Sequence, residues 1–317
     1  MNQNIDPNEW LIIVNPNAGN RKGKKDWEKI STLLKKENLL FSVKFTERKC
    51  QAITFAQEGI AAGFRKIITV GGDGTLNEVV NGVFLNNICP TTDISLAMIP
   101  IGTGNDWGRM FGIPSDYEKA IKIIGANKQM LHDIGLISFF NGTEKKSRYF
   151  INIAGLGFES AVVRRTNIQK DKGRSSKLIY FYSLLMSLIT YKNTKAEVVI
   201  DGIKVDADVF SINVGNGRYC GGGMRQTPNA LPDDGLLDVS VINGMGKIEI
   251  IRNLKILYDG TILDHPKIDG YRCKNLEVTS DSIIYTEADG ESLGHTPVEF
   301  SIIPACINIV YGTKIIQ

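Results

Sequence analysis

Residues 70–82, VGGDGTLNEVVNG, place one acidic side chain inside a glycine-rich turn, between an apolar run and a segment of helical periodicity. Glycines allow positive φ angles and a close approach of the main chain to a ligand, and the free N–H groups at a helix start attract anions. This geometry suits phosphate groups. Asp73 would repel a phosphate directly, so it fits if Mg²⁺ lies between them or if it polarises a neighbouring group. The alternative is an Asp-Gly turn in which Asp73 caps the helix.

Two further turns of the same type follow apolar runs in the first half of the chain. They are VNPNAG at 14–19 and PIGTGND at 100–106. In a parallel sheet the loops after the first, third and fourth strands lie at one edge, so all three can reach one ligand. This coincidence favours a nucleotide site. A G-x-x-x-x-G-K-[ST] sequence is missing from the chain, which excludes a P-loop enzyme. We interpret GLG at 155–157 as a tight turn and not as an NAD-binding fingerprint.

The elements that must position these loops can be predicted from apolar periodicity. The first 125 residues alternate apolar runs with helical patterns, and the predicted strands are 10–14, 41–45, 66–70 and 95–100. Helical stripes begin at Trp27, at Ala52 and near Thr75, and a fourth helix begins at Ser115, which has capping-box spacing to Glu118. Alternation of this kind builds a parallel sheet with helices on both faces, and ligands bind at the carboxyl ends of its strands.

After about residue 145 the apolar pattern changes to a period of two. Residues 196–207, AEVVIDGIKVDA, are a strand, an Asp-Gly turn and a second strand, which is a strong hairpin signal. Further predicted strands are 149–154, 208–214, 236–242, 276–279, 282–286 and 298–303. One helical insert is expected at about 175–191. The second half is therefore predicted to be mostly antiparallel β.

Bulk properties limit the functional class. A chain of 317 residues favours two domains. The 37 Lys and Arg residues nearly balance the 34 Asp and Glu residues, so the net charge gives no argument for a nucleic-acid partner. The five cysteines are odd in number and never in C-x-x-C spacing, which indicates a reducing compartment without disulfides or a zinc site. Neither a signal peptide nor an apolar run of membrane-spanning length is found, so we expect a soluble cytoplasmic protein.

Six motifs, in order from residue 12 to 291, resemble the diacylglycerol kinase catalytic family in its soluble bacterial lipid-kinase branch. They are NPNAG, GGDGT-x-NEV-x-NG, P-x-GT-x-NDW, GLGFE, NG-x-Y-x-GGGM-x-x-P-x-A-x-x-DDGLLDV and the late DGE. The GGDG part alone is shared with NAD kinases and phosphofructokinases. The resemblance implies an α/β domain of the phosphofructokinase and NAD kinase type over 1–140, an antiparallel β-sandwich over 141–304, and a last segment, 305–317, that returns to the first domain. The nucleotide would bind in the cleft between the domains.

The resemblance also implies roles for individual residues. ATP would contact Asn15, Pro16, Asn17, Ala18, Gly19, Thr46, Gly72, Asp73, Gly74, Thr75, Leu76, Asn77, Glu78 and Thr103. Mg²⁺ would be held by the carboxylate of Asp234 and the main-chain carbonyls of Leu231 and Leu236, although the residues alone favour a β-turn there. Glu291 would accept the proton of the substrate hydroxyl, with Asp289 close by; the residues alone favour a surface hairpin turn.

The implied reaction is transfer of the γ-phosphoryl group of ATP to a lipid hydroxyl. Diacylglycerol, which would give phosphatidic acid, is the first expectation for the acceptor, with a sphingoid base or ceramide as alternatives. This chemistry needs positioning and charge neutralisation more than covalent help. Two other classes stay open: an NAD kinase-like enzyme, and a non-catalytic nucleotide-binding regulator. A regulator would be expected to have lost Asp73 or the acids of the DGE motif, and this chain retains them.

A lipid acceptor requires a surface that meets a membrane, and one segment has suitable composition. Residues 164–177 carry a single acid, Asp171, and directly precede LIYFYSLLMSLIT. The basic residues of this segment are Arg164, Arg165, Lys170, Lys172, Arg174 and Lys177. They could dock on anionic headgroups beside an apolar route for the lipid, which predicts peripheral membrane association. The alternative is a solvated loop before a buried helix. A homodimer is a further expectation, because the branch that the motifs resemble often dimerises.

Overall fold

The computed structural model of the protein describes residues 5–102, 104–171 and 177–313, without the side chains of residues 170, 171 and 177–181. The chain divides into two compact units. Unit 1 comprises Met1–Ile134 and Pro304–Gln317, and unit 2 comprises Gly135–Ile303. Two long strands, β5 (Gln129–Asn141) and β14 (Glu291–Val310), contribute residues to both units. The boundary expected at residue 140 falls near the end of β5.

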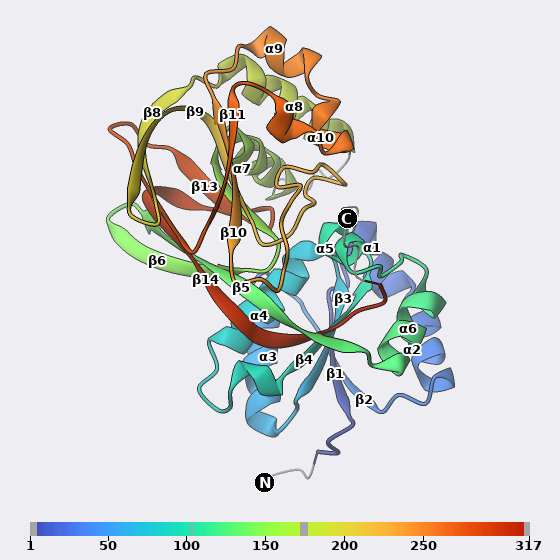
Figure 1. The fold of residues 1–317 in the computed structure, drawn as a ribbon. Helices are drawn as coiled ribbons and strands as arrows, with labels where there is room; N and C mark the ends of the chain where they lie inside the picture. Colours follow the sequence, from blue (N-terminus) through green and yellow to red (C-terminus); the bar gives the residue numbers. More distant parts are fainter. Residues whose placement is uncertain (1–4, 103, 172–176, 314–317) are drawn as a thin grey trace. The chain divides into compact units, whose positions relative to one another are not determined.

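Unit 1 contains a parallel sheet flanked by helices, as the strand-helix alternation predicts (Figure 1). Its first four strands are β1 (Trp10–Val14), β2 (Phe41–Phe45), β3 (Lys66–Gly71) and β4 (Ser95–Pro100). They lie in the order β4-β3-β1-β2. The end of β14 adds a parallel strand beside β4, with Asn308 opposite Ser95, so the expected return of the last segment to this sheet is observed.

The helices of unit 1 cover the sheet with the apolar stripes found in the sequence. They are α1 (Ala18–Lys25), α2 (Trp27–Lys36), α3 (Gln51–Ala62), α4 (Asp73–Phe84), the short 3₁₀ helix η1 (Thr91–Asp93), α5 (Asp106–Met110) and α6 (Tyr117–Ala126). Side chains of α2 and α6 pack against β1, β3 and β4 in one buried cluster. The predicted cap of α6 is wrong by one residue. Asp116, not Ser115, is the cap, because its carboxylate accepts the N–H of Lys119 at 2.9 Å.

Unit 2 is mostly antiparallel β, as predicted. Besides its parts of β5 and β14, its strands are β6 (Glu144–Phe150), β7 (Ile153–Gly157), β8 (Thr194–Ile200), β9 (Ile203–Gly215), β10 (Leu237–Asn243), β11 (Ile268–Cys273), β12 (Asn275–Thr279) and β13 (Tyr285–Ala288). Asp201 and Gly202 form the predicted two-residue turn between β8 and β9, with φ angles of 45° and 85°. Inward side chains of these strands form the main core of the unit.

The helices of unit 2 differ from the prediction. The helical insert expected at about 175–191 is observed as α8 (Lys177–Thr190), and it is preceded by a helix that was not predicted, α7 (Phe158–Asp171). Three further helices follow β10 and were not predicted: α9 (Lys247–Arg252), α10 (Ile256–Asp259) and the 3₁₀ helix η2 (Ile262–Asp264). Across the described part of the chain, no helix has both the length and the apolar character needed to cross a membrane.

Two strand-level predictions for residues 149–157 are wrong. The GLG sequence at 155–157 is not a tight turn but the end of β7, which pairs with β9 and β13. Glycine is needed at Gly155 because a β-carbon there would lie 2.7 Å from the carbonyl oxygen of Ile212. The strand expected at 149–154 is interrupted between β6 and β7, where N–H groups of the main chain turn toward the carboxylate of Asp289.

Candidate functional site

Three loops of unit 1 contact one another at the carboxyl ends of β1, β3 and β4. These strands are neighbours in the sheet, so their ends lie at one edge. A β-carbon on Gly72 would lie 3.2 Å from Cα of Gly102, and one on Gly19 would lie 2.1 Å from the carbonyl oxygen of Ile101. Only glycine allows backbones to approach this closely. The predicted juxtaposition of the loops after the first, third and fourth strands is therefore present.

The loop after β1 is held to helix α4 by a side chain. The amide of Asn15 donates to Oγ1 of Thr75 at 3.1 Å, and its carbonyl oxygen accepts the N–H of Asn17 at 3.0 Å. Gly19 and the two residues after it have left-handed φ angles, which interrupt the first turn of α1. The carbonyl oxygen of Pro16 accepts the N–H of Lys24 at 3.1 Å, which closes the loop. The predicted ATP-contacting segment 15–19, Ala18 included, thus lies beside the start of α4.

Asp73 is the first residue of α4, and its carboxylate binds the start of a different helix. Its two oxygens accept the N–H groups of Asp106 and Trp107, each at 3.2 Å. Asp73 therefore caps α5 and ties the loop after β3 to the loop after β4. The alternative considered from the sequence was that Asp73 caps its own helix, α4. Contact of Asp73 with a metal or with ATP stays a prediction.

Several other predicted ATP-contacting residues direct their side chains into the protein. Leu76 and Asn77 are fully buried within α4, and Thr46 is buried against the end of β1. The carboxylate of Glu78 accepts the N–H groups of Cys50 and Ala52 at 2.9 and 3.2 Å, which caps α3. These side chains stabilise the fold around the loops. The N–H of Leu76 also stays within the protein, because it donates to the carbonyl oxygen of Gly72 at 3.1 Å.

The remaining predicted ATP-contacting residues lie at the N-terminal end of α4. Gly72 is its N-cap residue in an extended conformation, and Gly74 lies in its first turn. Thr75 is nearly buried and accepts the bond from Asn15. Exposed N–H groups at the start of a twelve-residue helix are a suitable site for an anion. Thr103 lies outside the described residues.

In unit 2 the DGE motif forms the turn between β13 and β14. Asp289 and Gly290 have φ angles of 48° and 80°, as in a two-residue hairpin turn. The carboxylate of Asp289 accepts three main-chain N–H groups, those of Ile151, Asn152 and Ile153, at 2.9, 3.0 and 3.1 Å. Asp289 therefore anchors the turn to the gap between β6 and β7. Glu291 begins β14 with a partly exposed side chain, so a substrate can reach its carboxylate.

Two acids beside this turn, the buried Glu287 and the half-buried Glu159, were missed by the sequence analysis. Glu287 is buried on β13, and its carboxylate accepts the N–H of Gly290 at 2.9 Å. Burial and the nearby charge of Glu159 raise the pKa of Glu287 well above its usual range. Burial also raises the pKa of Glu159 to about 7, although hydrogen bonds from Cys220 and Gln226 oppose the shift. In the sequence, Glu287 lies in a strand between two smaller residues. Period-two alternation assigns such a position to the solvent face, so the pattern gave no signal of its burial.

The predicted Mg²⁺ ligands do not form a vacant oxygen cage. One carboxylate oxygen of Asp234 accepts the N–H of Leu236 at 3.0 Å, and the other contacts the guanidinium of Arg272. Arg272 also lies 3.5 Å from the carboxylate of Asp238, whose pKa burial raises to about 6 while Arg272 opposes the shift. The single guanidinium compensates one of the two carboxylates and occupies the second oxygen of Asp234. Contact of Mg²⁺ with Asp234 and with the main-chain carbonyls of Leu231 and Leu236 stays a prediction. Among the described residues, no cluster of three or more His, Cys, Asp or Glu is placed to bind one.

Two family models match the chain. Residues 9–137 match the diacylglycerol kinase catalytic domain, and residues 152–311 match the YegS C-terminal NAD kinase beta sandwich-like domain. The chain is 30% identical over 276 residues to a protein of Escherichia coli O127:H6 named "Probable lipid kinase YegS", with 87% of each sequence covered. It is likewise 30% identical over 277 residues to the protein of that name from Shigella flexneri, with the same coverage.

Solved structures show the same fold. A diacylglycerol kinase structure from Bacillus anthracis aligns with a TM-score of 0.72 at 23% identity, covering 98% of both chains. Yeast NADH kinase aligns with a TM-score of 0.56 at 13% identity, covering 98% of this chain and 85% of that one. At these identities the likeness concerns the fold alone. The predicted fold class, an α/β domain of NAD kinase type followed by an antiparallel β-domain, is confirmed.

Proposed function

Because this chain belongs to the lipid kinase family that joins a diacylglycerol kinase catalytic domain to a YegS-type C-terminal domain, we propose that its acceptor is diacylglycerol. The enzyme is an ATP-dependent lipid kinase, and ATP is its co-substrate. The proposed product is phosphatidic acid, a precursor in phospholipid synthesis. Mg²⁺, which neutralises phosphate charge in this chemistry, would arrive bound to ATP. The turn at Asp234 is given no part in the reaction.

The contact of the three glycine loops is the observation that supports the phosphoryl-transfer part of the proposal. Gly19, Gly72 and Gly102 let the backbones after β1, β3 and β4 approach one another closely at one sheet edge. N–H groups there can donate to phosphate oxygens without a side chain between them. Asp73 fixes the spacing of two of these loops through its bonds to the start of α5. Fixed donors need no reorganisation when charge develops during phosphoryl transfer.

Glu291 supplies the base in the proposed reaction. The acceptor O–H bond breaks as the hydroxyl oxygen bonds to the γ-phosphorus of ATP, the bond from that phosphorus to the bridging oxygen breaks, and ADP leaves with the electron pair. The proton passes to the carboxylate of Glu291. Asp289 and Glu287 act through the turn. Asp289 binds N–H groups between β6 and β7, and Glu287 binds the N–H of Gly290 within the turn, so both position Glu291. A positioned base contributes about 10²–10⁴-fold in rate.

The test is transfer of labelled γ-phosphate from Mg²⁺-ATP to a panel of acceptors. Diacylglycerol, monoacylglycerol, sphingosine and ceramide are offered in mixed micelles, and NAD is offered in buffer. Label in diacylglycerol, lost in Glu291→Gln and kept in the matched exposed variant Glu299→Gln, supports the proposal. Label in a sphingoid base or ceramide would contradict diacylglycerol as the acceptor but would support the assignment as a lipid kinase. Label in NAD alone, or in none of the five, overturns it.

A further inference from the structure

Helices α8, α9 and α10 gather at one end of unit 2 (Figure 1). Their inner side chains are anchored. Ile250, Ile256 and Leu257 pack against a buried cluster that includes Phe210 and Ile242. The sequence left two alternatives for α8, a buried core helix or an apolar surface beside basic residues. The distribution of its described side chains decides between them.

The described part of α8 has its polar and apolar side chains on unexpected sides. Ser183 and Ser187 are buried, with 0% and 1% exposure, and neither hydroxyl makes a hydrogen bond within the part of the chain that is described. Tyr182, Leu185 and Ile189 are exposed, Ile189 by 54%, although Leu188 does pack inward. A helix in water normally buries its apolar stripe and exposes serine. This arrangement suits a helix whose outer side meets an apolar phase.

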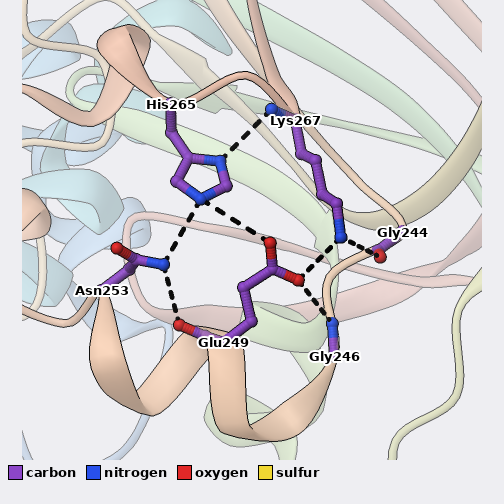
Figure 2. Close-up of polar contacts among 6 residues, drawn as sticks. All are labelled: Gly244, Gly246, Glu249, Asn253, His265 and Lys267. Atoms are coloured by element: carbon purple, nitrogen blue, oxygen red, sulfur yellow. Dashed lines mark hydrogen bonds and ion pairs between the residues drawn. The ribbon is translucent and has the colours of Figure 1, made fainter.

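Helix α9 continues the exposed apolar surface, and a polar network fixes its orientation (Figure 2). The carboxylate of Glu249 accepts the N–H of Gly246 at 3.2 Å and the ammonium of Lys267 at 2.7 Å. The amide of Asn253 lies 3.3 Å from Nε2 of His265. Glu249 and Asn253, four residues apart, share the inner face. Ile248, 68% exposed, and its neighbour along the outer face, Ile251, are thereby held toward solvent.

Basic residues accompany these apolar side chains. Lys247, Arg252 and Lys255 are exposed on α9 and the turn after it. The ammonium of Lys247 contacts the carbonyl oxygen of Ile189, so the outer faces of α8 and α9 are continuous. Over residues 246–258 the single acid, Glu249, is half-buried and paired with Lys267, and the next acid, Asp259 at the end of α10, is exposed. The surface is therefore apolar with a positive fringe.

Part of the basic segment expected to meet a membrane can be placed. Arg165 donates to Oγ1 of Thr190 at 3.3 Å, at the end of α8, and so adds to the positive fringe. Arg164 instead lies over the ring of Tyr285, 4.1 Å from its centroid. Lys170, Lys172, Arg174 and Lys177 lie outside the described side chains. The cations that carry the argument are therefore mainly those of α9, which the sequence analysis did not single out.

We propose that the outer sides of residues 182–189 and 248–258, here called the docking face, bind the surface of an anionic lipid bilayer. The apolar side chains enter the boundary between headgroups and acyl chains, and the lysines and arginines contact headgroup phosphates. This inference goes beyond the proposed phosphoryl transfer, because binding requires neither ATP nor turnover. Charge complementarity favours a bilayer over a second copy of the chain, which would bring these cations together.

The test is sedimentation of the full chain with vesicles in the absence of ATP. One vesicle set contains equal phosphatidylglycerol and phosphatidylcholine, and the other contains phosphatidylcholine alone. We expect binding to the anionic set, and a loss of about tenfold in partition for the double variant Ile248→Ser/Ile251→Ser. Arg252→Gln/Lys255→Gln should lose about tenfold on anionic vesicles and little on neutral ones, and high salt should remove that difference.

Matched exposed isoleucines elsewhere in unit 2 provide the control. Ile203 and Ile283 are also largely exposed, and Ile203→Ser/Ile283→Ser should bind vesicles like the unmodified chain. Equal losses in both isoleucine pairs, or an absence of vesicle binding by the unmodified chain, would overturn the proposal. Light scattering without vesicles is the second readout. A dimer that Ile248→Ser/Ile251→Ser converts to a monomer would assign the face to a second copy instead. Kinase assays in mixed micelles report on the acceptor separately.

Discussion

The acids of unit 1 and those of unit 2 are held in different ways. In unit 1, Asp73 and Glu78 accept main-chain N–H groups at helix starts, and Asp133 accepts the N–H of Ala305 at 2.6 Å. In unit 2, Glu159 and Glu287 are placed near each other in a poorly solvated region, and burial raises both pKa values. Unit 1 uses acids as caps that join loops. Unit 2 keeps acids whose ionisation opposes folding, beside the turn that carries the proposed base.

Asp289 shows that unit 2 uses both arrangements within a few residues. It accepts three N–H groups like a unit 1 cap, while Glu287, two residues earlier, is buried beside another acid. The difference teaches that the residue type alone does not indicate whether an acid stabilises the fold or serves chemistry. Substitutions can separate these roles because stability and turnover are measured independently.

The largest expected effect is on turnover, from Glu291. Glu291→Gln should lower kcat by about 10²–10⁴-fold, because the amide cannot accept the proton of the acceptor hydroxyl. Its thermal unfolding should match the unmodified protein, since Glu291 is partly exposed. The labelled-phosphate assay and a melting curve check both. Full activity in Glu291→Gln would show that Glu291 is not the base of the reaction.

Among these acids, Asp289 is expected to contribute most to stability. Asp289→Ala leaves three N–H groups without their acceptor and should lower the free energy of unfolding by about 2–4 kcal/mol. Asp289→Asn keeps one acceptor oxygen and tolerates the positive φ of 48°, so it should lose about half as much. Urea denaturation measures both variants. Equal stability of the alanine variant and the unmodified protein would contradict the anchoring role.

Asp73 should show a smaller loss of stability. Removing the cap of α5 in Asp73→Ala should cost about 1–2 kcal/mol, with exposed Glu28→Ala as the unit 1 control expected to cost much less. Nucleotide binding, followed with and without Mg²⁺, separates the cap from the predicted metal role. A variant of unchanged stability whose ATP affinity falls only in Mg²⁺ would show that the metal contact, and not the cap, is its function.

The smallest expected effect is on pH dependence. Burial raises the pKa of Glu159 from 4.5 to about 7 and that of Asp238 from 3.8 to about 6. The folded state therefore binds these protons more tightly than the unfolded state, so stability falls as pH rises from about 4 to 7. Glu159→Gln should be more stable than the unmodified protein by about 1 kcal/mol at pH 8 and equal to it at pH 4. Denaturation at both pH values checks this, and a variant that is less stable at pH 8 would contradict it.

Local chemistry allowed much of the fold to be predicted from the sequence. The strands at 10–14 and 95–100 were predicted with the bounds that are observed, because a buried strand has consecutive apolar residues. The partly exposed strand at 41–45 was also predicted with its observed bounds. The Asp201-Gly202 turn was predictable because two adjacent positions must accept positive φ. Helix α7 was missed because FESAVVRRTNIQKD lacks a continuous apolar stripe.

The partners of the acids could not be predicted, because they lie far away along the chain. Asp73 binds main-chain groups 33 and 34 residues away, and Asp289 binds groups 136 to 138 residues away. Motif resemblance placed both near the chemistry without indicating that both are caps. The burial of Glu287 likewise depends on β7 and α7 lying beside β13.

The sequence by itself determined the two-part architecture, the glycine loops and the family, because these depend on periodicity, turn chemistry and ordered motifs within short windows. Only the tertiary structure decided which acid caps which helix, that Arg272 occupies the acidic turn at Asp234, and that α8 turns its serines inward. The physical reason is that a hydrogen bond, an ion pair or a buried face depends on the partner brought near in space, and a local pattern of residues does not contain that partner.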